Sequence, residues 1–361
     1  MQSVAVPPAV HRLQARVGRE GLRMRGIVGI AVAALGVAAG SSSLVLPSRW
    51  DMSDPVLSPV PRAEDPCYSV KDPTIVRWNG RWHLFCTIRS KVRTHQIEYV
   101  SFRDWPSADA APRHILSVRG GYFCAPQVFY FRPHKKWYLI YQVSEPARRL
   151  QLQPAYSTTT DITNPKSWSE AKLLFPSADP EGVQGWIDFW VICDDQKAYL
   201  FFTSMDGRMW RMWTPIDRFP EGFSHCELAL RADIFEASHT YRLKGLNRYL
   251  TIVEAQGKGG RRYYKAYEAD RLDGEWRPLA DSEERPFAGA ANVLPPAVPW
   301  ADNISHGELI RDGYDETMTV DPRALRFLFQ GVLEEQKAGK TYGEFPWRLG
   351  LLTPAEDGSQ N

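Results

Sequence analysis

The sequence has little of what marks a nucleotide-binding or a helical protein. No long stretch repeats its apolar residues with the helical period, and Gly257-Lys258-Gly259-Gly260 predicts a surface hairpin turn rather than a phosphate loop. Charge of one sign is also lacking, because 44 basic residues nearly balance 42 acidic ones. This balance favours neither nucleic acid nor an anionic surface as a partner. We therefore expect no organic cofactor and an uncharged or mixed substrate.

Cysteine is scarce. The five cysteines are an odd number without metal-type spacing, so at least one stays free: Cys67, Cys86, Cys124, Cys193 and Cys226. Several lie in apolar segments that predict strands, where a thiol packs as a small apolar side chain. Disulfides and a cysteine-bound metal therefore contribute little to the expected fold.

The amino-terminal region has the features of an exported protein. The apolar stretch 26–40 is too short to span a membrane comfortably and follows four arginines: Arg16, Arg19, Arg23 and Arg25. Residues 1–40 therefore predict a secretory signal, with a retained anchor as the alternative, and the long lead raises Met24 as the true start. Residues 41–60, rich in Ser and Pro, predict a linker, and 356–361 a tail. We expect a secreted or periplasmic protein without a membrane span in its mature part.

Aromatic residues are plentiful, at 12% of the chain, and they mark a repeat. A turn followed by an apolar strand recurs about every 50 to 60 residues, anchored by Trp82, Trp137, Tyr199 and Tyr249. Each anchor follows a predicted strand (75–78, 127–131, 190–193, 240–243), and a fifth unit fits between 304 and 352. A fixed repeat of short strands is typical of propeller blades. The sequence predicts an all-β fold, a five-bladed β-propeller over residues 61–355.

Three isolated carboxyl groups lie where first strands of different blades would line a central channel: Asp72, Asp188 and Glu236. Asp72 precedes a proline, which disfavours a strand interior, so we expect it at a strand start. A carboxyl among apolar residues is costly to ionise, so at least one should have a raised pKa. Glycoside hydrolysis needs such a contrast between a protonated acid and an ionised base. The alternative for each acid alone is structural: a turn cap, an exposed strand edge or a bond to a neighbouring blade.

Seven motifs in family order resemble glycoside hydrolase family 62 over about residues 65–354. They are Lys71-Asp72-Pro73-Thr74, 125–131 with 137–142, 249–255, 272–276, 286–289, Ile304-Ser305-His306-Gly307-Glu308 and 348–353. The resemblance implies a five-bladed propeller that removes α-L-arabinofuranosyl branches from arabinoxylan or arabinan with inversion. It also implies a polysaccharide partner, and we expect a monomer.

The resemblance assigns roles by position. Asp72 would be the general base, Glu236 the general acid, and Asp188 the residue that tunes the acid's pKa. Lys71 would contact the arabinose and Tyr342 the polysaccharide. His306 would lie at the channel centre near a structural calcium ion, with an ordinary core histidine as the alternative. Gln127, Trp186 and Arg348 complete the expected substrate-binding set.

Some positions depart from the family pattern. Trp186 stands where proline is usual, Val143 where tryptophan is usual, and Gly343 where asparagine is usual. Trp186 and Trp190 are either sugar-stacking platforms or packing between blades. Glu308 is a rival acid, which we rank below Glu236. Two other functions stay open: a related propeller glycosidase acting on another pentose-containing polysaccharide, and a glycan-binding propeller without catalysis.

Overall fold

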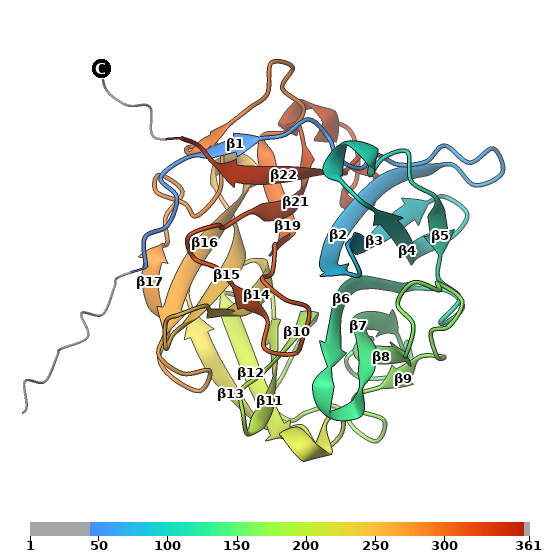
Figure 1. The fold of residues 1–361 in the computed structure, drawn as a ribbon, viewed down its shortest axis with the longest axis vertical. Coiled ribbons are helices and arrows are strands. Elements are labelled where there is room, and N and C mark those ends of the chain that lie inside the picture. The colour runs from blue at the N-terminus through green and yellow to red at the C-terminus, as the bar shows by residue number, and fades with distance from the viewer. Residues whose placement is uncertain (1–43, 357–361) are drawn as a thin grey trace, which may run out of the picture. The chain divides into compact units, whose positions relative to one another are not determined.

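The computed structural model describes residues 44–356. The predicted signal or anchor at 1–40 lies outside these residues. The described part is nearly all β-structure, in five sheets whose inner strands β2, β6, β10, β14 and β19 contact one another around a common axis (Figure 1). The predicted five-bladed propeller is therefore confirmed.

Three blades are simple four-stranded antiparallel meanders. Blade one holds β2 (Cys67–Trp78), β3 (Arg81–Ser90), β4 (Thr94–Phe102) and β5 (Arg113–Ile115). Blade two holds β6 (Phe123–Phe131), β7 (Lys136–Ser144), β8 (Leu152–Thr159) and β9 (Lys172–Leu173). Blade three holds β10 (Ile187–Cys193), β11 (Lys197–Thr203), β12 (Arg208–Pro215) and β13 (Ser224–Arg231).

The other two blades each gain strands from elsewhere. Blade four holds β14 (Glu236–Leu243), β15 (Tyr249–Gln256), β16 (Arg262–Ala269) and β17 (Arg277–Ala280), with β20 (Thr319–Val320) parallel to β14. Blade five holds β19 (Asn303–Leu309), β21 (Phe327–Val332), β22 (Arg348–Pro354), β1 (Trp50–Met52) and β18 (Val293–Leu294). The repeat detected in the sequence is this hairpin of first and second strands.

Helical structure in residues 44–356 is confined to six 3₁₀ turns. They are Trp105–Ser107, Arg132–His134, Ile216–Arg218, Lys258–Gly260, Glu334–Lys337 and Tyr342–Glu344. The turn at Lys258–Gly260 joins β15 to β16, as predicted for the glycine-rich segment. No helix in this part of the chain is long and apolar enough to cross a membrane.

The predicted linker at 41–60 is wrong in its described part. Trp50 is fully buried, and β1 pairs antiparallel with β22 along the register Trp50↔Pro354. The indole of Trp50 also donates to the carbonyl oxygen of Phe287 at 2.6 Å. The amino-terminal strand β1 is thus a strand of blade five. The propeller begins at Trp50 rather than at residue 61.

Polar side chains in the lower part of the channel tie each inner strand to the next. Thr74 accepts from the Val128 amide at 3.1 Å, and Gln127 bonds both the amide and the carbonyl of Val191. Trp190 and His239 donate to backbone carbonyls of β14 and β19. Arg311, paired with Glu308 at 2.6 Å, donates to the Ile75 carbonyl and so returns to β2. We call Thr74, Gln127, Trp190, His239 and Glu308 the inter-blade ring.

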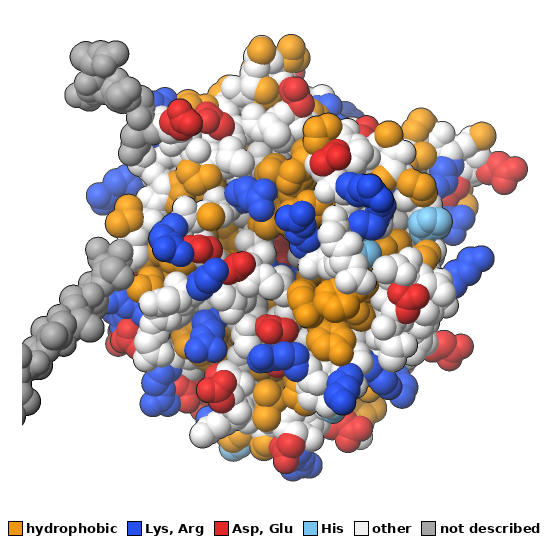
Figure 2. Space-filling view, in the orientation of Figure 1, with side chains coloured by type: hydrophobic (Ala, Val, Ile, Leu, Met, Phe, Trp, Pro, Cys, Tyr) orange, Lys and Arg blue, Asp and Glu red, His pale blue; other side chains and the backbone are white. Residues whose placement is uncertain are grey.

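The cysteines and the charges agree with the sequence analysis. All five cysteines are free, and only Cys226 is not fully buried. Lys and Arg side chains are interspersed with Asp and Glu over the face in view in Figure 2, without a large patch of one sign. Packing rather than cross-linking therefore holds the blades together.

Candidate active site

A β-bulge interrupts every inner strand at the same height, near one end of the channel that we call the mouth. The register of pairing breaks between residues 71 and 74, 124 and 127, 187 and 190, 236 and 239, and 305 and 307. Four of these bulges hold a residue with left-handed backbone: Asp72 (φ 49°), Ala125 (52°), Asp188 (56°) and Ala237 (51°). A bulge re-aims side chains, and here two of the re-aimed residues are aspartates.

Asp72 therefore does not lie at a strand start, as its proline neighbour predicted, but in the middle of β2. The bulge resolves the conflict, because Pro73 falls where the ladder is already interrupted and no donor is needed. Aspartate also tolerates the left-handed region better than most residues. The same sequence feature that argued against a strand interior marks the bulge.

Each bulge frees a backbone N–H, and in four blades a side chain from the second strand of the preceding blade accepts it. The pairs are Gln330 with Asp72 N (2.8 Å), Thr87 with Ala125 N (2.9 Å), Gln142 with Asp188 N (3.4 Å) and Glu254 with His306 N (2.8 Å). Buried N–H groups are costly when unpaired, so these four side chains fix the bulge geometry.

Blade four is the exception. The Ala237 amide donates to Asp188 Oδ2 at 3.0 Å, across the channel wall from β10. Thr203 occupies the second-strand position that would serve Ala237, since it pairs with Ile187 as Gln142 pairs with Cys124. Its buried hydroxyl has no partner. The carboxylate of Asp188 has taken the place of this hydroxyl and is thereby held beside Glu236.

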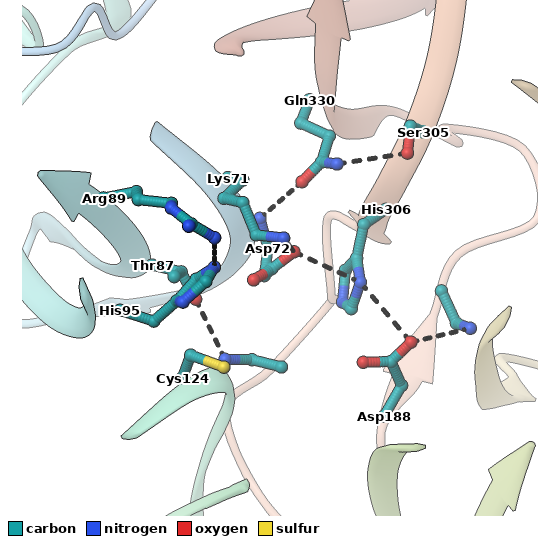
Figure 3. A network of polar contacts seen from close by, with 12 residues as sticks. Lys71, Asp72, Thr87, Arg89, His95, Cys124, Asp188, Ser305, His306 and Gln330 are labelled. Atoms are coloured by element: carbon teal, nitrogen blue, oxygen red, sulfur yellow. Dashed lines mark hydrogen bonds and ion pairs between the residues drawn. The ribbon is translucent and has the colours of Figure 1, made fainter. Parts of the chain in front are cut away.

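Asp72 is 3% exposed and has two nitrogen neighbours. Lys71 Nζ lies 3.5 Å and His306 Nδ1 lies 3.4 Å from Asp72 Oδ1 (Figure 3). The imidazole also reaches Asp188, with Nδ1 3.8 Å from Oδ2. Asp72 thus has a cation beside it and a ring that links it to the second carboxyl group.

Glu236 is 5% exposed, and among the described residues its one ion-pair partner, Arg262, is shared with Glu254. Arg262 NH1 lies 3.4 Å from Glu236 Oε1 but 2.8 Å from Glu254 Oε1. Burial, and then the charges of Glu254 and Asp188, raise the pKa of Glu236 well above its usual range, while Arg262 opposes the shift. Burial and these neighbouring charges therefore favour the protonated form of Glu236.

The pKa of Asp188 is also raised. Burial, followed by the nearby charge of Asp72, raises its pKa to about 8, against the lowering effect of Lys71 and of the Ala237 N–H. Two buried carboxyl groups with raised pKa, Asp188 and Glu236, thus face an aspartate that has a lysine beside it. Such a separation of protonation states is what acid–base catalysis requires.

His306 lies between Asp72 and Asp188 in the described site. Burial and the charge of Lys71 lower its pKa to about 3, so the ring is neutral. Calcium takes six to eight oxygen ligands, and residues 44–356 hold no group of three or more carboxylate, histidine or cysteine side chains that could bind a metal.

Lys71 and Tyr342 meet over the mouth. Lys71 Nζ lies 3.3 Å from the Tyr342 hydroxyl and 5.0 Å from the centre of its ring. Tyr342 is 42% exposed, among the most exposed large side chains of the described chain. Its ring is available to a ligand, while its hydroxyl is held by the buried site.

Other predicted substrate-binding residues do not join this group. Gln127 belongs to the inter-blade ring, with both ends of its amide bonded to β10, so its assignment as a substrate ligand is wrong. Arg348 lies on β22, with its guanidinium 5.2 Å from the Trp300 ring. Trp186 is 5% exposed and packs edge-on against Phe189 and Phe202.

The structure also settles three alternatives from the sequence. Trp186 and Trp190 pack between blades, since Trp190 is 1% exposed and stacks on His239 at 4.2 Å. Val143 is fully buried in an apolar cluster. Glu308 is fully buried in the inter-blade ring and bonded to Arg311, which agrees with its lower rank as an acid.

Sequence reasoning missed Glu254, Arg262 and Gln330 as parts of the site. They lie on second and third strands, not on inner strands, and act on Glu236, His306 and Asp72 through single contacts. A signal was present for Glu254, because a lone acid follows Thr251-Ile252-Val253 in an otherwise apolar strand. The other two carry no pattern that distinguishes them.

Comparisons with known proteins agree with this geometry. Residues 50–353 match the profile of glycosyl hydrolase family 62. The chain is 43% identical over 318 residues to Alpha-L-arabinofuranosidase C of Cellvibrio japonicus, covering 86% of this chain and 47% of that protein. It thus spans about half the length of this curated relative.

Solved structures of the family share this fold over nearly their whole length. The catalytic domain of a GH62 α-L-arabinofuranosidase from Coprinopsis cinerea superposes with a TM-score of 0.79 at 37% identity, covering 85% of this chain and 97% of that one. A GH62 hydrolase in complex with xylotriose superposes with a TM-score of 0.79 at 36% identity, covering 86% and 99%. On the profile match, the identity and the bulged acid site together, the chain belongs to glycosyl hydrolase family 62.

Proposed function

We propose that the protein is an α-L-arabinofuranosidase that removes arabinofuranosyl branches from arabinoxylan or arabinan with inversion of configuration. The observation that carries this is Glu236, a buried carboxyl group with a raised pKa, whose one ion-pair partner in the described chain, Arg262, is shared with Glu254. The relatives from Cellvibrio japonicus and Coprinopsis cinerea are α-L-arabinofuranosidases by name, and a relative of the same family binds xylotriose. A xylan backbone is therefore the first substrate to test.

In the proposed reaction, Glu236 and Asp72 each transfer one proton. Protonated Glu236 donates to the glycosidic oxygen as the bond to the arabinose breaks. Ionised Asp72 accepts a proton from a water that attacks the anomeric carbon from the opposite face, so the product has the inverted configuration. After the product departs, Glu236 takes up a proton from solvent and Asp72 releases the proton that it accepted from water. The charge of Asp188, when that group is ionised, opposes ionisation of Glu236 and so favours its protonated form.

Lys71, His306 and Tyr342 take no part in bond breaking. They position the Asp72 carboxylate and the sugar. Lys71 and His306 hold the Asp72 carboxylate from two sides, at 3.5 and 3.4 Å. The exposed ring of Tyr342 offers an apolar face to a sugar of the polysaccharide, as aromatic side chains commonly do.

Proton NMR of the first product tests the mechanism. Incubation with arabinoxylan should release arabinose, initially as the β-anomer. Initial α-anomer would overturn inversion, and release of another pentose or of oligosaccharides would favour the related propeller glycosidase. Binding of the polysaccharide without any release would favour a glycan-binding propeller.

Three further properties belong to this proposal. We propose export to the periplasm or the medium, action as a monomer, and a calcium ion near His306 held mainly through water. Cell fractionation, light scattering and elemental analysis of the purified protein test them in turn.

A further inference from the structure

One rim of the mouth carries a cation that has no acidic partner. Arg89, at the mouth end of β3, is half-buried and forms no ion pair with residues 44–356. Its Nε donates to the Tyr68 hydroxyl at 2.7 Å, and its NH1 lies 3.0 Å from His95 Nε2. These contacts fix the plane of the guanidinium and leave NH2 without a hydrogen-bond partner. NH2 is also not among the fully buried unpaired atoms, so it reaches solvent.

Gly343 makes room for this guanidinium. A Cβ atom at residue 343 would lie 2.5 Å from Arg89 NH2 and 2.6 Å from Cζ. The Gly343 carbonyl also accepts from Tyr68 at 2.8 Å, so the same tyrosine holds both partners. Glycine is required here by space and not by backbone conformation, because the left-handed glycines of the chain do not include Gly343. The cation is thus built into the loop that follows Tyr342.

Arg89 lies close to the acid site. Arg89 and His95 lie on the same side as Lys71 and Asp72 (Figure 3). The charges of Lys71 and Arg89 both act on His95, and together with burial they lower its pKa to about 3, so the ring adds no charge. The loop carboxylate Glu344 feels the charges of Lys91 and Arg89, but it forms no ion pair within residues 44–356 and is engaged by the amide and hydroxyl of Thr341 at 2.9 Å. A ligand whose sugar covers Tyr342 would therefore meet a guanidinium edge without an ion-pair partner among the described residues.

We propose that Arg89 binds the carboxylate of a uronic acid residue carried by the polysaccharide near the scissile arabinose. A guanidinium recognises a carboxylate through paired N–H groups, and its NH2 edge is the part left free by Tyr68 and His95. This assignment rests on the proposed arabinofuranosidase function for its catalytic consequence, but not for the binding itself. Two sources share the chemistry: a glucuronate branch on xylan and a galacturonate in a pectic chain.

Binding is tested first, with oligosaccharides that carry no arabinose and so are not turned over. Titration calorimetry with the full protein would compare a glucuronate-branched xylo-oligosaccharide and an oligogalacturonide with their carboxyl-reduced forms. We expect the acidic form of one of them to bind about tenfold more tightly than its reduced form, with the preference shrinking as salt rises. The better ligand identifies the source. Equal binding of acidic and reduced forms in both series would overturn the proposal.

Variants assign the effect to the residue. Arg89→Gln should remove the preference for the acidic form, and Gly343→Asn should reduce it by displacing the guanidinium. Lys91→Gln removes the same charge from the exposed β3–β4 turn and is the matched control. An equal loss in Lys91→Gln would mean a general charge effect and would overturn the proposal, as would an unchanged preference in folded Arg89→Gln. Arabinose release from arabinoxylan is measured alongside, so a failure of the proposed function shows as absent release with the binding preference intact.

Discussion

The mouth and the lower channel are built on the same five inner strands, yet they treat similar residues in opposite ways. In the inter-blade ring Glu308 has an arginine of its own at 2.6 Å, and His239 donates to a backbone carbonyl. At the mouth Glu236 shares Arg262 with Glu254, and His306 lies between two carboxyl groups. Residue type alone does not distinguish a structural acid from a reactive one. The difference lies in whether each buried charge has a partner that nothing else uses.

The largest test of this contrast is removal of the reacting carboxyl groups. Asp72→Ala and Glu236→Ala should each lower arabinose release by about a thousandfold or more, because general acid–base steps contribute about 10²–10⁴ each. The measurement is initial rates on arabinoxylan, with thermal melts to confirm folding. Activity retained in Glu236→Ala would remove the acid assignment and leave only the architecture.

The second test changes the glutamate of the lower channel. Glu308→Gln should leave substantial activity at low temperature but lower the free energy of unfolding by about 3 kcal/mol, because Arg311 then keeps a buried charge without its carboxylate. Urea unfolding measures the loss. A variant as stable as the wild type but inactive would mean that Glu308, and not Glu236, is the acid.

The third test concerns the pKa of Asp188, about 8 in the folded protein and about 4 in an unfolded chain. Between these pH values the folded state binds a proton that the unfolded state releases, so the free energy of unfolding falls as pH rises. Asp188→Asn should remove that slope and stabilise the protein at pH 8, where the folded state otherwise binds a proton that the unfolded state has released.

The same substitution should move the basic limb of the activity profile to lower pH, because the charge of Asp188 no longer opposes ionisation of Glu236. Activity and urea unfolding across pH 4 to 9 measure both effects. If neither the pH–activity profile nor the pH dependence of the free energy of unfolding changes, Asp188 does not couple to Glu236.

The smallest test compares two threonines at equivalent positions. Thr87→Val removes the acceptor of the Ala125 amide and should cost about 1–2 kcal/mol, whereas Thr203→Val removes a buried hydroxyl without a partner and should be neutral or slightly stabilising. Thermal melts of the two variants under one condition make the comparison. Equal losses would mean that Asp188 has not displaced Thr203 from the bulge of blade four.

The sequence predicted the fold well because the repeated hairpin is local. Each anchor aromatic lies in a second strand a few residues after its turn, so short-range patterns were sufficient. The closing strand β1 was missed, since three residues in a Ser- and Pro-containing stretch form a strand only between β18 and β22, which follow far along the sequence. Trp50 was the one available sign, because a large aromatic side chain is unusual in an exposed linker.

The acids were found because a lone carboxyl in an apolar strand stands out, whereas the residues that set their protonation do not. Arg262 and Glu254 act through contacts between strands that the sequence does not pair. Gln127 was misassigned for the converse reason. A polar residue on an inner strand resembles a ligand contact until its amide is seen to be fully bonded to Val191.

The pairing of β1 with β22 has a consequence for building on this scaffold. Trp50 faces Pro354 in that pair, at the end of blade five that lies away from Gln330 and the bulges. These two ends of the propeller, Trp50 and Pro354, therefore lie side by side at the end of blade five away from the mouth. The same proximity makes the ends easy to join, so new termini could be opened in a surface turn such as Asn79-Gly80 to give a circularly permuted enzyme.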